Sequence, residues 1–569
     1  MGGDRVGPRL TPAIADTCPF SGQFRGHVDV RLKTAYLLQC EPFKGHAYPE
    51  IRLAAGLPFY KPGVRKMHTN QSATYHSFVT KILLVLTFLW MPILVGCGGS
   101  AASQSSNSNF LGGAPGSSSV QVRITDAPSD RVIALGLTLT SIKATSSSGA
   151  EYDLLPGSGA VEVTHLAATN EPLAVVDVPQ GDYTQMEVSV SGAKVTYLDA
   201  STNQPVEKQF SDGWTVTVPL NPAITIGAEP SVLNIDVDVA NTVYLDLADN
   251  SVNVNSPVLK ISSEPVLTSG EQHPEDGRVE HVLGSVTSVS GNSFTLNLGR
   301  SGMSLTFQTD ENTTLGAATL SALTGEKVEV SGSSQADGSL LASRVQDLGS
   351  SSDEVVIAGL VSGFTDSGYL SLVSQDGTGA GMTGDMLGSS FGLNLDGGTI
   401  YAVDTHDFDM EGLPFGFDES SIMPGQRVAV GSHSSVQPDP EGGATGVIDA
   451  TVVELQQQTL NGTVSNYTAA ETPGTATFDL VLPVDGTSYL SAANPGTLVI
   501  HVYQRSTTDV HNLSGALSDG QSVQVRGLLF YYNPAVPSSR RAKAATAGVS
   551  AQPFCFVASR IKGIVAPPM

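Results

Sequence analysis

The sequence is poor in aromatic and charged residues and in helical patterning. Aromatic residues make up 6% of the 569 residues, and charged residues make up 15%. No amphipathic helical stretch of useful length occurs after residue 120. Sparse aromatic side chains leave few surfaces on which sugar rings stack. The absence of a helical period argues against a helical body and leaves short strands and turns as its building units.

Basic residues are scarce beyond residue 97. Residues 1–66 carry ten Lys and Arg against five Asp and Glu. The chain from Cys97 onward carries 18 of the 29 basic residues and 49 of the 54 acidic ones, a net charge of −31. A strongly acidic surface repels nucleic acid and anionic lipid head groups. We therefore expect no nucleic-acid partner, and the charge suits a soluble exported body.

The longest apolar run is Lys81–Cys97, with the sequence KILLVLTFLWMPILVGC. A secretory signal has a positive flank, an apolar core of about 7–15 residues and small residues at the cleavage point. Lys81 supplies the flank and Ile82–Ile93 the core. The run is shorter than the roughly 20 residues of a membrane span, and Pro92 disfavours a long continuous helix. We predict a signal peptide over 67–96, and the alternative is a transmembrane helix with an incidental cysteine.

The end of this run, Leu94-Val95-Gly96-Cys97, resembles the bacterial lipoprotein lipobox. The resemblance implies that Cys97 is lipidated and that a lipid anchor joins the mature chain to a membrane. Glycines rather than an aspartate follow Cys97, which by the same resemblance favours the outer membrane of the cell envelope. Residues 97–119 are then a Ser/Gly tether. Met67 is well placed as the true start, so 1–66 is predicted to be an over-called N-terminal extension; the alternative is a cytoplasmic extension.

Cysteine is rare, with four in the chain at positions 18, 40, 97 and 555. Removal of the signal and lipidation of Cys97 would leave Cys555 alone. No disulfide framework is then possible, although the compartment is oxidising. The segment around Cys555, FCFVAS, predicts a buried strand residue.

Residues 120–268 alternate apolar and polar side chains in short runs such as VQVRITDAP and MEVSVSGAKVTYL, which predicts an antiparallel β-sandwich. Three pieces, Ile124–Pro128, Val178–Thr184 and 233–261, resemble the bacterial lipoprotein family called domain of unknown function 4382. The second piece also resembles Ig/transthyretin-like sandwiches, which implies that Tyr183 packs inward. Asp126 is interpreted as a turn residue at a strand end, with ligand contact as the alternative.

Residues 269–280 are polar and are interpreted as a linker. An internal repeat follows, because three markers recur three times in the same order. Each unit opens with G-x-V, continues with a turn glycine before an alternating strand, and closes with a short strand; the opening glycines are Gly284, Gly359 and Gly462. The pattern resembles domain of unknown function 5666, whose modules imply OB-like β-barrels. We expect an all-β fold with barrels at 281–348, 355–456 and 458–564.

Two local patterns suggest chemistry. Ser390 lies in a G-x-S-x-G spacing, but the following residues predict strand, turn and strand rather than the helix that a nucleophile elbow needs. The acidic run Asp407, Asp409 and Glu411, with Asp418 beyond it, loosely follows a calcium-loop spacing. Ca²⁺ is therefore a candidate cofactor, and a solvated acidic loop is the alternative.

These features predict a non-enzymatic, membrane-anchored lipoprotein of the bacterial cell envelope, with modular β-domains for binding or assembly. The alternative is a carbohydrate- or polymer-binding accessory protein that uses calcium. The ligand, protein or polysaccharide, is not specified by the sequence. An enzyme would need convergent polar groups in a deep pocket.

Overall fold

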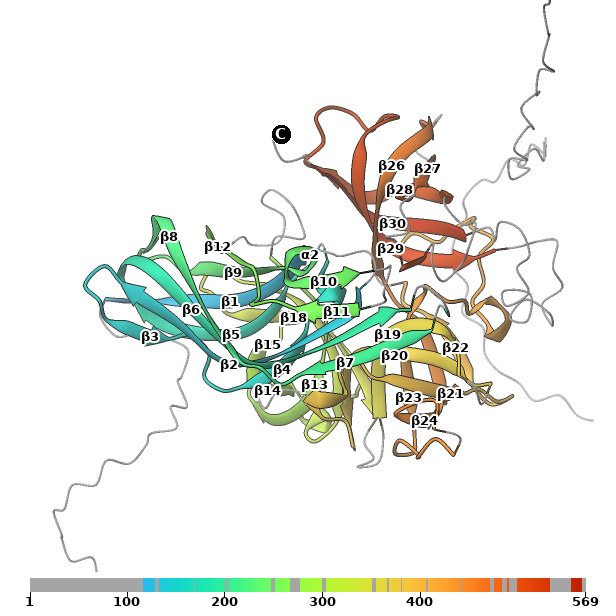
Figure 1. Cartoon of the computed structure of the whole chain (residues 1–569), viewed down its shortest axis with the longest axis horizontal. Coiled ribbons are helices and arrows are strands. Elements are labelled where there is room, and N and C mark those ends of the chain that lie inside the picture. The colour runs from blue at the N-terminus through green and yellow to red at the C-terminus, as the bar shows by residue number, and fades with distance from the viewer. Residues whose placement is uncertain are drawn as a thin grey trace, which may run out of the picture. The chain divides into compact units, whose positions relative to one another are not determined.

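The computed structural model describes residues 116–564. The gaps are 128–131, 168, 200–201, 203, 247–250, 267–276, 299–302, 350–354, 366–367, 380, 406–407, 441, 471–474, 484–488, 491–498 and 533–553. The predicted extension, signal and lipidation site at Cys97 lie outside these residues, as does Asp407. Strands dominate (Figure 1), and the α-helix α2 (Val239–Thr242) is four residues long. None of the helices in this part has the length and apolar character needed to cross a bilayer.

The N-terminal domain has a first sheet of four strands in the order β12-β9-β1-β5. Their bounds are β1 (Ser117–Ala127), β5 (Glu171–Pro179), β9 (Ser231–Asp238) and β12 (Leu259–Pro265). Strands β1 and β9 pair in parallel, unlike the fully antiparallel sandwich expected from the sequence. The chain passes through the second sheet between these two strands, and such a crossover is what a parallel pair requires.

The second sheet of this domain has the order β3-β2-β6-β7, with β4 on β2 and β8 on β6. The bounds are β2 (Val132–Ser146), β3 (Glu151–Asp153), β4 (Gly159–Glu162), β6 (Gly181–Leu198), β7 (Pro205–Phe210) and β8 (Trp214–Ile226). A hairpin joins β10 (Val243–Asp246) to β11 (Ser251–Val254). Tyr183 is buried and its hydroxyl donates a hydrogen bond of 2.7 Å to the Pro179 carbonyl, which confirms the inward packing.

The first repeat forms a closed ring of five strands, β13-β14-β15-β18-β17. The bounds are β13 (Arg278–Ser290), β14 (Ser293–Leu298), β15 (Met303–Gln308), β17 (Lys327–Ser334) and β18 (Leu340–Gly349). The parallel pair of β15 with β18 closes the ring, and the short β16 (Thr314–Leu315) also pairs in parallel with β18. This is the strand order of an OB-like barrel.

The third repeat has the same ring, β26-β27-β28-β30-β29. The bounds are β26 (Gln458–Thr468), β27 (Ala476–Val481), β28 (Val499–His511), β29 (Ser522–Tyr531) and β30 (Phe554–Gly563). Strand β28 pairs in parallel with β30 in two stretches, which correspond to β15 and β16 of the first barrel. Cys555 lies buried in β30, as the sequence predicted.

The second repeat keeps this order, although its fifth strand is broken in two. Its strands are β19 (Val355–Phe364), β20 (Leu370–Gly379), β21 (Ser390–Asn394), β22 (Ile400–Val403), β23 (Arg427–Ser432), β24 (Gly446–Asp449) and β25 (Val452–Leu455). β24 pairs in parallel with β21, and β25 pairs with β22 and β23. Ser390 opens the strand β21 and is followed by β22, so the G-x-S-x-G segment has the strand–turn–strand form predicted for it.

The 3₁₀ turns are η1 (Thr164–Leu166), η2 (Leu320–Leu323), η3 (Gly384–Met386) and η4 (Glu419–Ser421).

The recurring glycines have a steric cause. The turn glycines Gly325, Gly425 and Gly520 have φ of 89°, 98° and 87°, a region that side-chain-bearing residues rarely adopt. At the opening glycines, a Cβ would come within 2.1–2.7 Å of a carbonyl oxygen on the next strand. The barrel walls therefore need glycine at both kinds of position.

Candidate functional site

The acidic run that suggested calcium has several separate partners in the structure. Asp409 pairs with Arg505 at 2.7 Å, and Arg505 also donates to the Glu411 carbonyl at 2.9 Å. Asp418 is the N-cap residue of η4, and its Oδ1 accepts a hydrogen bond of 2.6 Å from the Ser420 hydroxyl. With Asp407 outside the described residues, calcium binding by this set stays a prediction.

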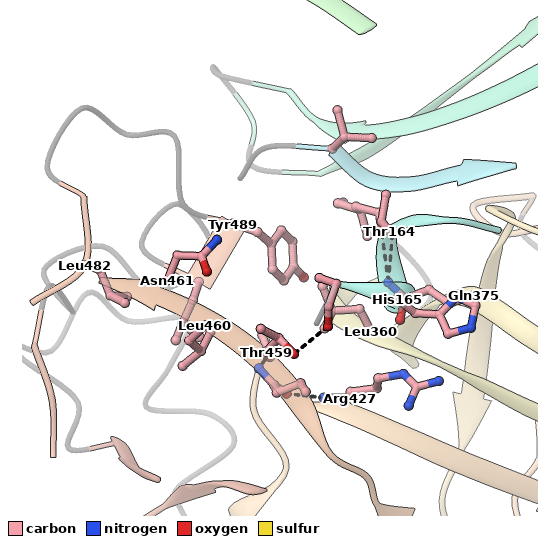
Figure 2. A pocket seen from close by; sticks show the side chains of 16 residues that line it. Thr164, His165, Leu360, Gln375, Arg427, Thr459, Leu460, Asn461, Leu482 and Tyr489 are labelled. Carbon is pink, nitrogen blue, oxygen red and sulfur yellow. Dashed lines mark hydrogen bonds between the residues drawn. The ribbon is translucent and has the colours of Figure 1, made fainter. Parts of the chain in front are cut away.

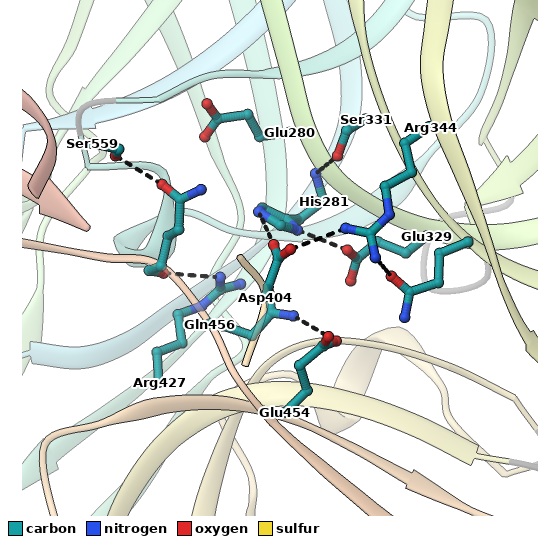
Figure 3. A network of polar contacts seen from close by, with 12 residues as sticks. Glu280, His281, Glu329, Ser331, Arg344, Asp404, Arg427, Glu454, Gln456 and Ser559 are labelled. Carbon is teal, nitrogen blue, oxygen red and sulfur yellow. Dashed lines mark hydrogen bonds and ion pairs between the residues drawn. The ribbon is translucent and has the colours of Figure 1, made fainter. Parts of the chain in front are cut away.

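A different set of polar side chains is gathered where the barrels meet (Figure 3). His281 comes from β13, Glu329 from β17, and Asp404 follows β22 of the second barrel. His281 Nδ1 lies 2.7 Å from Glu329 Oε1, and its Nε2 lies 3.5 Å from Asp404 Oδ2. Arg344 donates to Asp404 Oδ1 at 3.0 Å. We call His281, Glu329, Asp404 and Arg344 the ionic cluster.

Local backbone geometry places the imidazole. The pairing of β13 with β17 shifts register between Val279 and Val282, and His281 within this bulge has φ of 53°. A bulge redirects a side chain out of the regular alternation, and non-glycine residues at positive φ are uncommon. His281 is therefore held in a special conformation that aims it at two carboxylates.

The charges of the ionic cluster compensate one another. Burial alone would lower the pKa of His281, but Glu329, Asp404 and Glu280 outweigh that effect and raise the pKa above its usual value. A protonated imidazole uses both ring N–H groups on the two carboxylates. One ligand atom from each of His281, Glu329 and Asp404 lies within 4.8 Å of the others, which is a spacing that a metal ion could bridge. The imidazole would first have to lose a proton, because the protonated ring has no lone pair to offer.

A second ion pair beside the cluster joins the first barrel to the third. Arg526 donates to Glu280 Oε2 from Nε at 3.0 Å and from the terminal nitrogen at 2.7 Å, and Arg560 lies 3.8 Å from Oε1. Burial would raise the pKa of Glu280, but Arg526 and Arg560 hold it well below its usual range. Glu280 was expected in a linker, yet β13 begins at Arg278 and includes it. The pairing with Arg526 explains why this polar residue belongs to the barrel.

Two cavities are lined in part by polar side chains of these domains. One, of about 230 Å³, is lined by His281, Asp404, Arg344 and the hydroxyl residues Ser331, Ser333 and Ser343. The other, of about 130 Å³, is lined by residues of the sandwich and of the second and third barrels, and we call it the junction cavity (Figure 2). His165 lines it, and its Nδ1 donates a 2.8 Å hydrogen bond to Glu162 Oε2, while burial lowers the pKa of His165. A neutral His165 adds polarity to the cavity without adding charge.

Sequence reasoning did not find these residues. His281, Glu329 and Asp404 come from three separate segments, and no fixed spacing links them. The polar character of the three positions was visible, but which barrel faces another could not be read from one strand at a time.

Two stretches of the chain match family models. Residues 117–254 match Domain of unknown function (DUF4382), and residues 284–346 match Domain of unknown function (DUF5666). The DUF4382 domain is the sandwich and the DUF5666 domain is the first barrel, which confirms both resemblances seen in the sequence. The second and third barrels share the strand order of the DUF5666 domain.

Comparison with curated proteins gave no significant match. Among solved structures, the single-stranded DNA binding protein from Thermus aquaticus covers 38% of this chain and 95% of its own, at 14% identity and a TM-score of 0.14. A likeness at that TM-score carries no argument about fold or ligand.

Proposed function

We propose that the chain is a non-enzymatic lipoprotein of the bacterial cell envelope, anchored by lipid at Cys97, whose β-domains serve binding or assembly. The observation that carries the anchor is the segment Lys81–Cys97, with its single lysine, short apolar core and terminal Leu-Val-Gly-Cys. A Ser/Gly tether follows it, and the DUF4382 domain begins directly after the tether. Several acyl chains on one cysteine hold a protein firmly, at about 0.8 kcal/mol for each buried methylene.

Contacts between the domains support a role as one binding body. Gln121 of the sandwich donates to the Gly338 carbonyl of the first barrel at 2.7 Å. Gln426 of the second barrel donates to the Leu529 carbonyl of the third at 2.9 Å, and Thr459 of the third donates to Ala167 of the sandwich at 2.8 Å. Buried polar contacts of this kind fix the domains against one another. Cavities formed between the domains then keep a constant shape for a ligand.

The alternative of a carbohydrate-binding accessory protein depends on aromatic surfaces. Among the described residues, the strongly exposed large hydrophobic side chains are Tyr244, Val258, Ile400, Val499 and Ile564. Tyr244, the aromatic one, lies on the β10–β11 hairpin of the sandwich rather than on a barrel. A row of stacking rings on a barrel face is thus not found in the described part, and the first proposal is preferred.

Metabolic labelling with palmitate tests the anchor. We expect the wild-type chain to take up label and Cys97→Ala to lose it. Cys555→Ala is the matched control, because that thiol is buried in β30 and should leave labelling unchanged. Equal labelling of the wild type and Cys97→Ala would remove the lipoprotein proposal.

A further inference from the structure

Polar and apolar side chains both line the junction cavity. Figure 2 shows Arg427, His165 and Gln375 together on one side of the view and Tyr489, Asn461 and Leu482 on the other. Further apolar side chains line the cavity, namely Val132, Ile133, Leu360, Leu460 and Leu490. Mostly apolar walls with a few polar groups are typical of small-molecule sites.

Arg427, at the start of β23, is a buried cation without a direct anionic partner. Its side chain is 6% exposed, and no carboxylate in the described part of the chain lies within ion-pair distance of it. The guanidinium makes one long hydrogen bond, 3.4 Å to the Gln457 carbonyl, and its Nε has no partner. Burial, with a contribution from Arg526, lowers the pKa of Arg427 to about 10, so the group is still charged at neutral pH. Burying an unpaired charge is costly, and an anion in the cavity would offset that cost.

The charges of Glu329, Glu162 and Glu280 act on Arg427 without a direct ion pair. Glu329 is held by His281 and Glu280 by Arg526, and the oxygens of Glu162 are also engaged. Oε1 accepts from the Leu135 and Thr164 backbone N–H groups at 2.8 and 2.9 Å. Oε2 lies 3.1 Å from the His165 backbone nitrogen and 2.8 Å from its ring. Glu162 is therefore fixed on its own domain and does not turn towards Arg427.

Gln375 supplies an acceptor that also lacks a partner. The side chain is 5% exposed, and its Nε2 donates to the Ile133 carbonyl at 3.0 Å and to Thr164 Oγ1 at 3.3 Å. Because a carbonyl accepts and never donates, this bond fixes which end of the amide is nitrogen. The remaining atom, Oε1, is buried without a hydrogen bond and calls for an O–H or N–H donor.

We propose that the junction cavity binds a small hydroxylated monocarboxylate. Its carboxylate meets Arg427, its hydroxyl donates to Gln375 Oε1, and its apolar body packs against the leucines and Tyr489. A guanidinium suits a carboxylate because its N–H groups match the two oxygens. The inference names a ligand class for the binding body proposed above, and it does not depend on the anchor at Cys97.

Isothermal titration of the detergent-solubilised full chain with mandelate tests the site, since mandelate carries a carboxylate, a hydroxyl and a ring. Benzoate lacks the hydroxyl, and we expect it to bind about tenfold more weakly, the value of one hydrogen bond of roughly 1.4 kcal/mol. Benzyl alcohol lacks the charge and should give no detectable heat. Cys97→Ala should bind mandelate like the wild type, which separates this inference from the lipoprotein proposal.

Arg427→Met keeps the length of the side chain and removes the charge. We expect it to weaken mandelate binding at least 30-fold, of the order found when one partner of a buried charge pair is removed. Arg505→Met is the matched control, because Arg505 pairs with Asp409 and does not line the cavity. It should leave the affinity unchanged.

Thermal melts without ligand give a second, independent readout. Because Arg427→Met removes a buried cation that has no direct ion pair, its Tm should equal or exceed that of the wild type. A large fall in Tm would show that Arg427 is structurally paired and would overturn the proposal. So would wild-type affinity for mandelate in Arg427→Met, equal binding of benzyl alcohol and mandelate, or no binding of any of the three probes to the folded wild type.

Discussion

The ion pair between Glu280 and Arg526 gives a quantitative test of how the first and third barrels are joined. The side chains are 7% and 4% exposed, and the shortest nitrogen–oxygen distance is 2.7 Å. At about 3 Å and an effective dielectric constant of about 20, two unit charges attract by roughly 6 kcal/mol. Loss of hydration offsets most of this attraction when both charges are buried. The pair as a whole therefore contributes little, although breaking it leaves one buried charge uncompensated.

These opposing contributions predict a strongly non-additive result. Glu280→Leu or Arg526→Met alone should lower the free energy of unfolding by about 3 kcal/mol, the lower end of the 3–5 kcal/mol for a broken buried pair. The double variant should lower the free energy of unfolding by no more than either single variant does. The coupling energy is then about 3 kcal/mol, at the upper end for residues in contact. Arg560, 3.8 Å from the same carboxylate, keeps a charge nearby and limits full recovery.

Urea denaturation of the full chain, followed by circular dichroism, measures the four free energies. A shift of the midpoint at constant slope reports a change of stability. The control cycle uses Lys143 and Glu151, which lie 3.5 Å apart and are 35% and 62% exposed. Its coupling should stay below about 0.5 kcal/mol, as for exposed pairs. Additivity of Glu280→Leu and Arg526→Met within about 0.5 kcal/mol would refute the reasoning.

Burial, followed by the nearby carboxylates, raises the pKa of Asp126 to about 9. Between about pH 4 and 9 the folded state then holds a proton that the unfolded state has lost, so stability falls as pH rises. Asp126→Asn should remove this slope and raise Tm more at pH 8 than at pH 5; parallel Tm–pH curves would contradict it. At Gly527 a Cβ would lie 2.0 Å from the Val557 carbonyl oxygen, so Gly527→Ala should lower the free energy of unfolding by about 1–3 kcal/mol. Gly416→Ala is the control, because a Cβ there meets nothing within 4 Å and should leave Tm nearly unchanged. If the acidic run around Asp409 binds calcium, thermal melts in Ca²⁺ and in EGTA will differ, and identical curves would remove that prediction.

The barrels were predictable because their signals are local. The turn glycine at Gly425 is required by its own φ of 98°, and Gly359 by a carbonyl 2.1 Å from where its Cβ would be. Each requirement recurs in every barrel of this form, so glycine recurs at the same positions of the repeat. Strand alternation likewise marks one face of each strand as apolar. The second barrel keeps these sequence features, although its fifth strand is broken in two.

The ionic cluster and the junction cavity were not predictable because their signals are not local. Alternation places Glu329 on the polar face of β17, where solvent is the ordinary neighbour. In the structure that face is covered, and Glu329 is 5% exposed against His281, 48 residues away. The bulge that turns His281 inward depends on a register shift with another strand. The period-two alternation shows which side chains share a face of a strand, but it does not show which element packs against that face.

The three barrels carry different residues at equivalent positions. These differences explain how similar barrels take different places in the fold. Arg344 and Arg560 hold the same position of the fifth strand, and each reaches a carboxylate of another barrel, Asp404 and Glu280. The second barrel has Val452 there, an apolar side chain that cannot form such a pair. Mispairing two barrels would leave a buried charge without its partner, at a cost of several kcal/mol. The repeated positions thus build each barrel wall, while the charged positions that differ between repeats favour particular contacts between barrels.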